Sequence, residues 1–382
     1  MKGGIKIGRI FGIDVSLDYS WFFIFALITL GLTFIIFPQL SPGLSLVSYL
    51  AMGVIASVLF FASVLFHEAM HSLVAKRNGM DIEGIRLLIF GGVSELNEEP
   101  RSPGVEFKMA FAGPASSIFL GVIFLGIFFV GRNLDLGPLI NVPAFWLGYV
   151  NLLLGVFNLL PGFPLDGGRV FRSAVWYLTG NLRRATGIAT ALGKGIAYAM
   201  ILVGVLGPFI GNLNLLWFVF IGWYLLRAAD SGYRQVIFDE ALEGVMVGQA
   251  MTQNPETVDP NISIEEMVKD HFMQHRWVAY PVVENDHVEG IITIDSLNNL
   301  PRRSWKRKRV RDVMQPLSTE IVTTPDTEVS AVMPKLNSTK NIGRLLVIRG
   351  GQLIGILTKT DVTKTVVRRL RSKEREKEKP AA

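Results

Sequence analysis

Six runs of predominantly apolar residues constrain this chain of 382 residues more than any other feature of its sequence. Most of them reach or approach the roughly 20 residues that an α-helix needs to cross the hydrocarbon core of a bilayer. Because lipid offers backbone groups no hydrogen bonds, such runs are expected to be helical. The sequence therefore predicts a polytopic α-helical membrane protein, with about six transmembrane helices within residues 1–230. The runs lie near residues 20–37, 46–75, 107–131, 141–160, 190–210 and 214–228.

Charged residues between the runs predict how the chain is oriented. The connections at 38–45 and 211–215 carry no charge, whereas the alternate connections contain Lys and Arg, with Arg132 as the exception. By the positive-inside rule, we expect both termini to lie in the cytoplasm, in a multi-pass protein of the cell membrane. The first 18 residues are mixed and contain glycine, so we expect no cleavable signal peptide and a retained first helix.

Composition excludes several classes of chemistry. The formal net charge is +6, but the Lys and Arg residues lie mainly in connections and in the C-terminal tail, so we expect no nucleic-acid partner. The chain has no cysteine, which excludes disulfides, cysteine-ligated zinc and cysteine nucleophiles. Any metal site must therefore be built from His, Asp or Glu.

The segment between the second and third runs, residues 82–96, is too polar to span a membrane. It is rich in β-forming residues around Gly91 and Gly92. We predict a short membrane-associated β-hairpin. If it lies at membrane depth, its backbone must be satisfied by protein groups, since lipid cannot do so.

His67, Glu68 and His71 form an H-E-x-x-H motif inside the second apolar run. On a helix, the two histidines lie one above the other and can share a metal ion, while Glu68 can accept a proton from metal-bound water. Zinc suits neutral imidazoles and lowers the pKa of bound water from 15.7 to about 7. In a soluble helix the pair is often accidental. Inside a membrane, each unpaired charged group costs roughly 2.5–3.5 kcal/mol, which favours a functional site.

Asp166 is the candidate for a third ligand, because catalytic zinc commonly takes three protein ligands and leaves one position open. It follows Pro161 and Pro164, which cannot continue a regular helix, at the end of the fourth run. We expect a broken segment that turns Asp166 inward. The alternative is that Asp166 merely caps a helix at the membrane interface.

The two motifs together resemble those of the site-2 proteases, intramembrane zinc metalloproteases with HExxH on one span and N-x-x-P-x-x-P-x-D-G on another. Both are complete here, at residues 67–71 and 158–167. The resemblance covers residues 1–230 and implies one Zn²⁺ per subunit. It also implies that His67, His71 and Asp166 are the zinc ligands and that Glu68 is the general base. By the same resemblance, Asn158, Gly91 and Gly92 would lie near the substrate or the oxyanion. The hairpin would receive the substrate as an added strand. The Ala112-Gly113-Pro114 step is also similar to the family, although small residues there equally serve close helix packing.

After about residue 230 the sequence becomes soluble in character and contains an internal repeat. Gly290-Ile291-Ile292-Thr293 is echoed by Gly355-Ile356-Leu357-Thr358, about 65 residues later. The order resembles a tandem pair of CBS domains, a soluble α+β module that a subgroup of site-2 proteases carries. We assign residues 231–243 to a linker, 244–300 to repeat 1, 301–368 to repeat 2, and 369–382 to a charged tail.

The CBS resemblance implies an adenine nucleotide bound between the repeats, with Thr358 and Asp361 contacting its ribose. Repeat 1 has Ser296 where the family pattern expects Asp, which puts an equivalent second site in doubt. The alternative is a pair used only for packing or for a homodimer through the CBS domains.

The sequence predicts a zinc metalloendopeptidase of regulated intramembrane proteolysis. It would cut a transmembrane segment of a single-span membrane protein, with activity adjusted by nucleotide. A CBS-regulated cation transporter and a relative that binds membrane proteins without cutting them are the rivals. The intact Glu68 argues against both, because neither needs a base beside a metal ligand.

Overall fold

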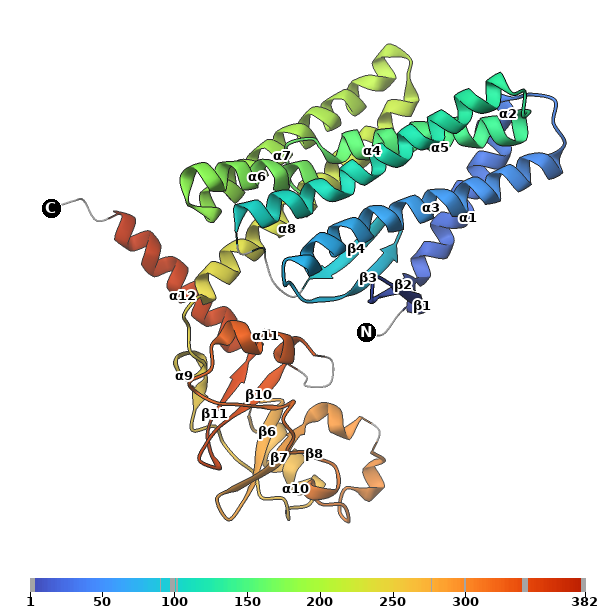
Figure 1. Ribbon diagram of the computed structural model, residues 1–382. Coiled ribbons are helices and arrows are strands. Elements are labelled where there is room, and N and C mark those ends of the chain that lie inside the picture. Colours follow the sequence, from blue (N-terminus) through green and yellow to red (C-terminus); the bar gives the residue numbers. More distant parts are fainter. Residues whose placement is uncertain are drawn as a thin grey trace. The chain divides into compact units, whose positions relative to one another are not determined.

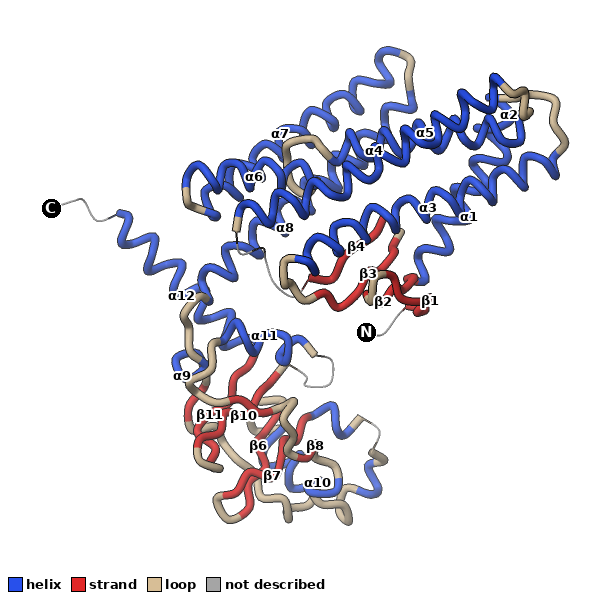
Figure 2. The backbone as a smooth tube through the Cα atoms, viewed as in Figure 1, coloured by secondary structure: helices blue, strands red, loops and turns tan. Residues whose placement is uncertain are grey.

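A computed structural model describes residues 4–89, 91–96, 100, 102–275, 277–298, 300–338 and 343–378. The chain forms two compact units, Met1–Arg234 and Gln235–Ala382 (Figure 1). Helices make up most of the first unit, and the second combines strands with short helices and the longer helix α12 (Figure 2).

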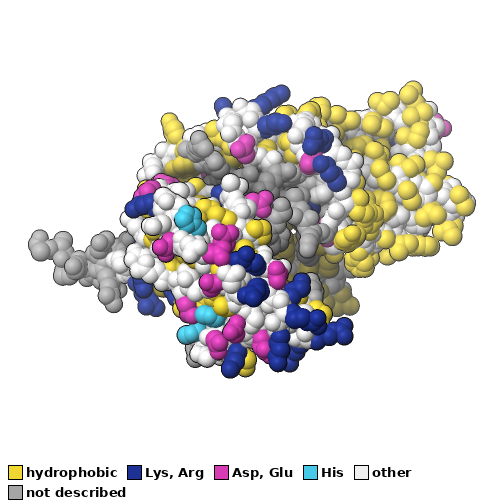
Figure 3. Space-filling view, turned by 90° about the horizontal axis from the view of Figure 1, so that it is seen from below, with side chains coloured by type: hydrophobic (Ala, Val, Ile, Leu, Met, Phe, Trp, Pro, Cys, Tyr) yellow, Lys and Arg dark blue, Asp and Glu magenta, His cyan; other side chains and the backbone are white. Residues whose placement is uncertain are grey.

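Six helices in the described residues are long and apolar enough to cross a membrane, which confirms the predicted number. The first consists of α1 (Tyr19–Gly31), a π-helical segment (Leu32–Ile36) and α2 (Phe37–Leu40). The others are α3 (Leu46–Arg77), α4 (Pro103–Asn133), α5 (Pro138–Asn158), α7 (Leu182–Leu206) with its 3₁₀ extension to Ile210, and α8 (Leu216–Leu242), preceded by a short 3₁₀ turn. Hydrophobic side chains dominate their outer surface, whereas charged side chains are frequent on the second unit (Figure 3).

Polar caps and close packing set the limits and spacing of these helices. Ser45, Ser102 and Asn181 accept hydrogen bonds from the first turns of α3, α4 and α7. Helices α4 and α5 approach closely because glycines face the partner helix: a Cβ at Gly148 would lie 2.7 Å from Leu125. This close contact packs α4 directly against α5.

A four-stranded sheet packs beside α3, with strand order β1-β2-β3-β4. Its strands are β1 (Gly4–Ile10), β2 (Ile13–Asp18), β3 (Ile82–Leu88) and β4 (Gly91–Leu96). The β2 and β3 strands are parallel and the other pairs antiparallel. The predicted hairpin is therefore present as β3 and β4. It forms one half of a four-stranded sheet, and the sequence predicted only this half.

The N-terminal stretch, interpreted from sequence only as mixed, forms the other half of this sheet. Every second residue of β2 is buried. Ile13 packs with Ala69 of α3, and Leu17 packs with Val64 of the same helix. These contacts seat the sheet on the turns of α3 that carry the H-E-x-x-H motif.

The second unit contains two sheets, ordered β5-β11-β10-β9 and β6-β7-β8. The predicted repeats exchange strands, since β5 of the first pairs with β11 of the second, and β8 of the second pairs with β7 of the first. The elements are α9 (Val247–Ala250), β5 (Thr252–Gln253), α10 (Ile264–Glu266), β6 (Ala279–Glu284), β7 (His287–Thr293), β8 (Gln315–Pro316), β9 (Val322–Thr323), α11 (Val329–Asn337), β10 (Arg344–Arg349), β11 (Gln352–Thr358) and α12 (Lys359–Glu378).

Two of the expected segments, the linker and the tail, continue helices. The expected linker, residues 231–243, continues α8 as far as Leu242, where Ala241 and Leu242 are buried in the core of the second unit. The helix ends before Gly244, whose φ of +66° is left-handed. The expected tail begins inside α12, which contains residues 369–378, because helix-forming Lys, Arg and Glu residues continue without a breaker.

Candidate metal centre and active site

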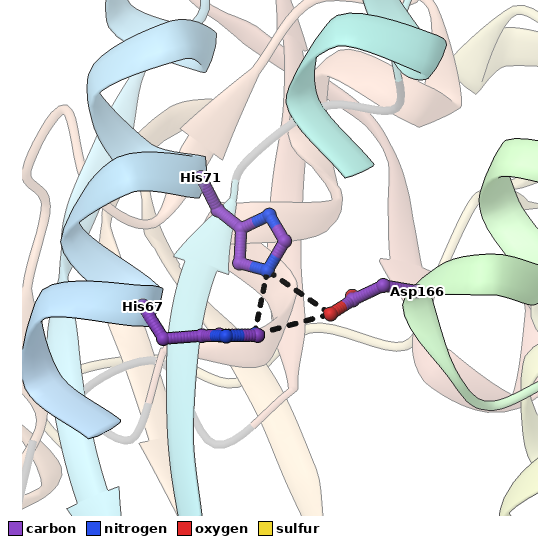
Figure 4. Close-up of side chains that lie close together, drawn as sticks. All are labelled: His67, His71 and Asp166. Atoms are coloured by element: carbon purple, nitrogen blue, oxygen red, sulfur yellow. Dashed lines mark hydrogen bonds and ion pairs between the residues drawn. The ribbon is translucent and has the colours of Figure 1, made fainter. Parts of the chain in front are cut away.

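His67 and His71 lie one turn apart on α3, and both rings point toward Asp166 (Figure 4). The two Nε2 atoms are 3.1 Å apart. The Oδ2 atom of Asp166 lies 3.1 Å from His67 Nε2 and 3.2 Å from His71 Nε2. Within the described ranges of the chain, these are the only three His, Asp or Glu residues that converge so closely. The three predicted ligands are thus brought together by the fold.

The donor set and its spacing fit a zinc ion. Two imidazole nitrogens and one carboxylate oxygen are a common catalytic zinc set, and tetrahedral bonds of about 2.0–2.1 Å place ligand atoms roughly 3.3 Å apart. The three measured separations fall within about 0.2 Å of that value. The three ligand atoms therefore need little movement to hold the ion, and one coordination position remains for water or substrate.

Asp166 reaches the histidines because the chain breaks after α5. That helix ends at Asn158, and Asp166 is the first residue of α6 (Asp166–Thr179). Between them, the backbone N–H of Phe163 donates to the carbonyl of Ala189 on α7 at 3.2 Å. A Cβ at Gly193 would lie 2.0 Å from the carbonyl oxygen of Phe163, so the loop lies directly on α7. Asp166 does begin a helix, but its carboxylate contacts the histidines.

Groups on α4 contact the Nδ1 atom of both imidazole rings. His67 Nδ1 lies 2.8 Å from Ser117 Oγ, and His71 Nδ1 lies 2.7 Å from the carbonyl oxygen of Met109. The Met109 carbonyl can only accept, so Nδ1 of His71 carries the proton and Nε2 is left for a metal. Neither Ser117 nor Met109 was predicted from the sequence, because neither belongs to a recognisable motif.

Gly113 of α4 lies directly against the metal centre. A Cβ at this position would be 2.1 Å from His71 Nε2 and 2.7 Å from His67 Nε2. Only glycine leaves this space open. In the sequence, the Ala112-Gly113-Pro114 step pointed to this position through its similarity to the family, although close helix packing also explained small residues there.

Glu68 extends from the half-buried face of α3 toward β4. A Cβ at Gly92 would lie 2.2 Å from Glu68 Cγ, so the backbone of β4 runs directly over this side chain. Gly91, at the start of β4, has a φ of +125° that favours glycine. The Gly91-Gly92 pair therefore brings an outer strand of the sheet up to the candidate base.

Asn158 is half-buried at the end of α5, and its amide nitrogen donates to the carbonyl of Leu154 at 3.0 Å. This contact is with its own helix, and its role near the oxyanion stays a prediction.

Thr358 and Asp361 line a cavity of about 490 Å³ in the second unit. The Thr358 hydroxyl donates to Asp361 Oδ2 at 2.6 Å, and the Thr252 hydroxyl donates to Oδ1 at 3.2 Å. In the first repeat, the hydroxyls of Thr293 and Ser296 lie 3.1 Å apart. The cavity is lined by both repeats, through Thr252, Asn254, Pro255, Glu256, Trp277, Val278, Ala279, Tyr280, Pro281, Arg344, Ile356, Thr358, Thr360, Asp361 and Lys364.

Fold and site together define a metal-dependent hydrolase set among membrane helices and joined to a soluble tandem module. The sequence profile of peptidase family M50 matches residues 55–134 and 131–202, and that of the CBS domain matches 247–300 and 310–368. The chain is 34% identical over 374 residues to the putative zinc metalloprotease sll0528 of Synechocystis, covering 95% of this chain and 96% of that protein.

Two further comparisons involve Methanocaldococcus jannaschii. The zinc metalloprotease MJ0392 is 34% identical over 367 residues, covering 96% of this chain and 97% of that protein. A solved structure, the site-2 protease from the same organism, matches 60% of this chain and 94% of its own, with 29% identity and a TM-score of 0.41.

The chain belongs to peptidase family M50, the site-2 protease family, and is a metalloprotease with a tandem CBS module. The predicted family, fold class and enzyme class are confirmed.

Proposed function

We propose that this metalloprotease hydrolyses a peptide bond within a transmembrane segment of a membrane-protein substrate, with Glu68 as the general base. The triangle formed by His67, His71 and Asp166 carries the proposal, because its two histidines lie in the last third of α3, an apolar helix of membrane-spanning length.

Each protein group has a distinct task in this reaction. A zinc ion, when bound by His67, His71 and Asp166, supplies the Lewis acid that makes water nucleophilic at neutral pH. Glu68 accepts a proton from the attacking water and passes it to the leaving amine. The hydrogen bonds from α4 keep both imidazoles in the orientation that zinc requires. Asn158 is proposed to assist near the substrate carbonyl.

The outer strand β4 is the proposed docking site for substrate. Among the strands that the structure describes, β4 pairs with β3 alone, so its other edge can accept an extended peptide. The contact between Gly92 and Glu68 places such a peptide beside the base. A helical substrate exposes no peptide bond, so we expect single-span substrates that unwind easily at Gly, Pro or polar residues.

We propose that water enters from the cytoplasm. His71 is six residues from Arg77, at the basic end of α3, and the positive-inside rule assigns that end to the cytoplasm. Both termini and the CBS module would then also be cytoplasmic.

We further propose that an adenine nucleotide binds the cavity beside Thr358 and Asp361 and adjusts proteolysis. The cavity is large enough for a small ligand, and the exposed Trp277 on its wall offers an aromatic surface for a base. Burial lowers the pKa of the Arg344 guanidinium, so an anionic phosphate would stabilise its charged form. A homodimer through the CBS module is the alternative use of this unit.

The test is cleavage of a single-span substrate by purified protein, comparing wild type with Glu68→Gln and Asp166→Ala. Glu68→Gln should retain zinc and lose about 10²–10⁴-fold in cleavage rate, the usual contribution of a general base. Asp166→Ala should lose both zinc and cleavage. Glu243→Gln, an exposed glutamate outside the site, is the matched control and should cleave normally.

Cleavage by Glu68→Gln at the wild-type rate would refute the proposed mechanism. Zinc flux into liposomes that does not depend on Glu68 would favour a transporter instead.

A further inference from the structure

A buried ion pair joins α4 to α6, away from the metal ligands themselves. Glu106, in the first turn of α4, is 0% exposed, and Arg172, in the middle of α6, is 1% exposed. Arg172 Nε donates to Glu106 Oε1 at 2.6 Å, and its Nη2 contacts the same oxygen. The protein thus keeps two opposite charges together where side chains are almost fully removed from solvent.

Such a pair is an unusual way to hold two helices together. Removing charges from water is costly, and apolar side chains of similar volume often pack at least as well. What a buried pair adds is geometry, because a guanidinium and a carboxylate meet only within a narrow range of distances and angles. The pair therefore fixes the position of α6 relative to α4 more sharply than apolar contact would.

That relative position matters because α4 orients the two histidine ligands of α3, whereas α6 carries the third ligand. His67 and His71 are oriented by Ser117 and Met109 of α4, whereas Asp166 is carried by α6. Asp166 and Arg172 belong to one continuous helix, so a shift of Arg172 along α4 would move Asp166 with it.

Arg172 also secures the loop that precedes Asp166. Its guanidinium lies 5.1 Å from the ring centroid of Phe163, within cation–π range. Phe163 is in turn bonded to Ala189 of α7. One buried side chain therefore connects α4, α6 and the broken segment.

We propose that Glu106 and Arg172 are positioning residues that set the separation between Asp166 and the two histidines, and thereby the affinity and geometry of the metal site. This inference rests on the proposed zinc centre and deepens it.

The test replaces both charges at once with Glu106→Met/Arg172→Met, which removes both members of the pair together and keeps side chains of similar length. The metal-free variant should unfold near the wild-type temperature. Its zinc affinity, measured by competition with a chelator, should fall about 10–100-fold, the range found when groups behind metal ligands are removed. The visible absorption of bound Co²⁺ should weaken or shift as the tetrahedral site distorts.

The matched control is Asp230→Asn, which breaks the ion pair between Lys194 Nζ and Asp230 Oδ1 (2.5 Å) on α7 and α8. It should leave zinc affinity and the cobalt spectrum unchanged. Arg172→Lys, which retains the charge but not the planar fork, serves as the second variant if the double variant fails to fold. It should weaken zinc binding severalfold.

The test distinguishes failure of the proposed metal centre from failure of the proposed positioning role. If the wild-type protein binds no zinc, the proposed metal centre is wrong. If the wild type binds zinc, and a folded double variant or Arg172→Lys binds it equally well with the same cobalt spectrum, the positioning role is overturned.

Discussion

Gly113 carries no functional group, yet the two histidine Nε2 atoms lie within 2.1 and 2.7 Å of where its Cβ would be. The metal site therefore depends on an empty volume as well as on donor atoms. Ser117 and the Met109 carbonyl complete this arrangement by bonding the far nitrogen of each ring. Residues of α4 thus determine how the ligands of α3 are presented.

Gly113→Ala is expected to weaken zinc binding by about 10–100-fold or more, because the added methyl group must displace at least one imidazole. Zinc affinity measured by chelator competition is the readout. Gly126→Ala on the same helix is the control, since a Cβ there meets nothing within 4 Å. Equal zinc affinity in both variants would show that the histidines do not need this space.

Ser117→Ala should also reduce zinc affinity, by about 10–100-fold, since His67 would lose the group that orients it. Ser63→Ala is a matched control, because the hydroxyl of this buried serine on α3 donates to the carbonyl of Leu59 in its own helix. Affinities that fall equally in the two variants would indicate general loosening of the bundle.

At the scale of elements, β4 brings the sheet to the catalytic side chain. Strands β1 and β2 of the same sheet come from the N-terminal stretch, about 70 residues before β3, and β2 packs on α3 through buried Ile13 and Leu17. The sheet is therefore a support that holds β4 against Glu68.

Gly92→Ala should lower the cleavage rate by about 100-fold while zinc binding is retained, because a Cβ would lie 2.2 Å from Glu68 Cγ and push the base aside. Gly104→Ala, where a Cβ meets nothing within 4 Å, should behave as wild type. Normal cleavage by Gly92→Ala would contradict the close fit of β4 over the base.

The sequence predicted the six spans, and it singled out the three side chains that the fold brings together, because both follow from local rules. Apolar length identifies a membrane helix, and H-E-x-x-H places two ligands by helical spacing alone. Strands β1 and β2 were missed because Gly4, Gly8 and Gly12 obscure the alternation of Ile13, Val15 and Leu17. The pair of Glu106 and Arg172 could not be foreseen, since its members are 66 residues apart and meet only through tertiary packing.

At the scale of the whole molecule, a membrane protease and a CBS module share one chain, and α8 runs from one unit into the other. The buried residues Ala241 and Leu242 at its end belong to the core of the second unit. A ligand that changes the packing of that core therefore has a covalent, helical route to the membrane unit.

Adenine nucleotide is expected to raise the unfolding temperature of the second unit by several degrees when present at about 100 times its dissociation constant. Lys364→Met, which removes a cation from the cavity wall, should reduce this shift. Lys269→Met, outside the cavity lining, should not. The absence of any shift with AMP, ADP or ATP would count against nucleotide regulation.

The position of the cut tests the central claim most directly. Purified protein reconstituted in vesicles with a single-span substrate should yield two fragments, whose masses place the break inside the apolar span. In water enriched in ¹⁸O, the new carboxyl terminus should gain one heavy oxygen, and Glu68→Gln should yield neither fragment. A cut confined to the soluble flanks, or fragments that form equally with Glu68→Gln, would contradict intramembrane hydrolysis at this site.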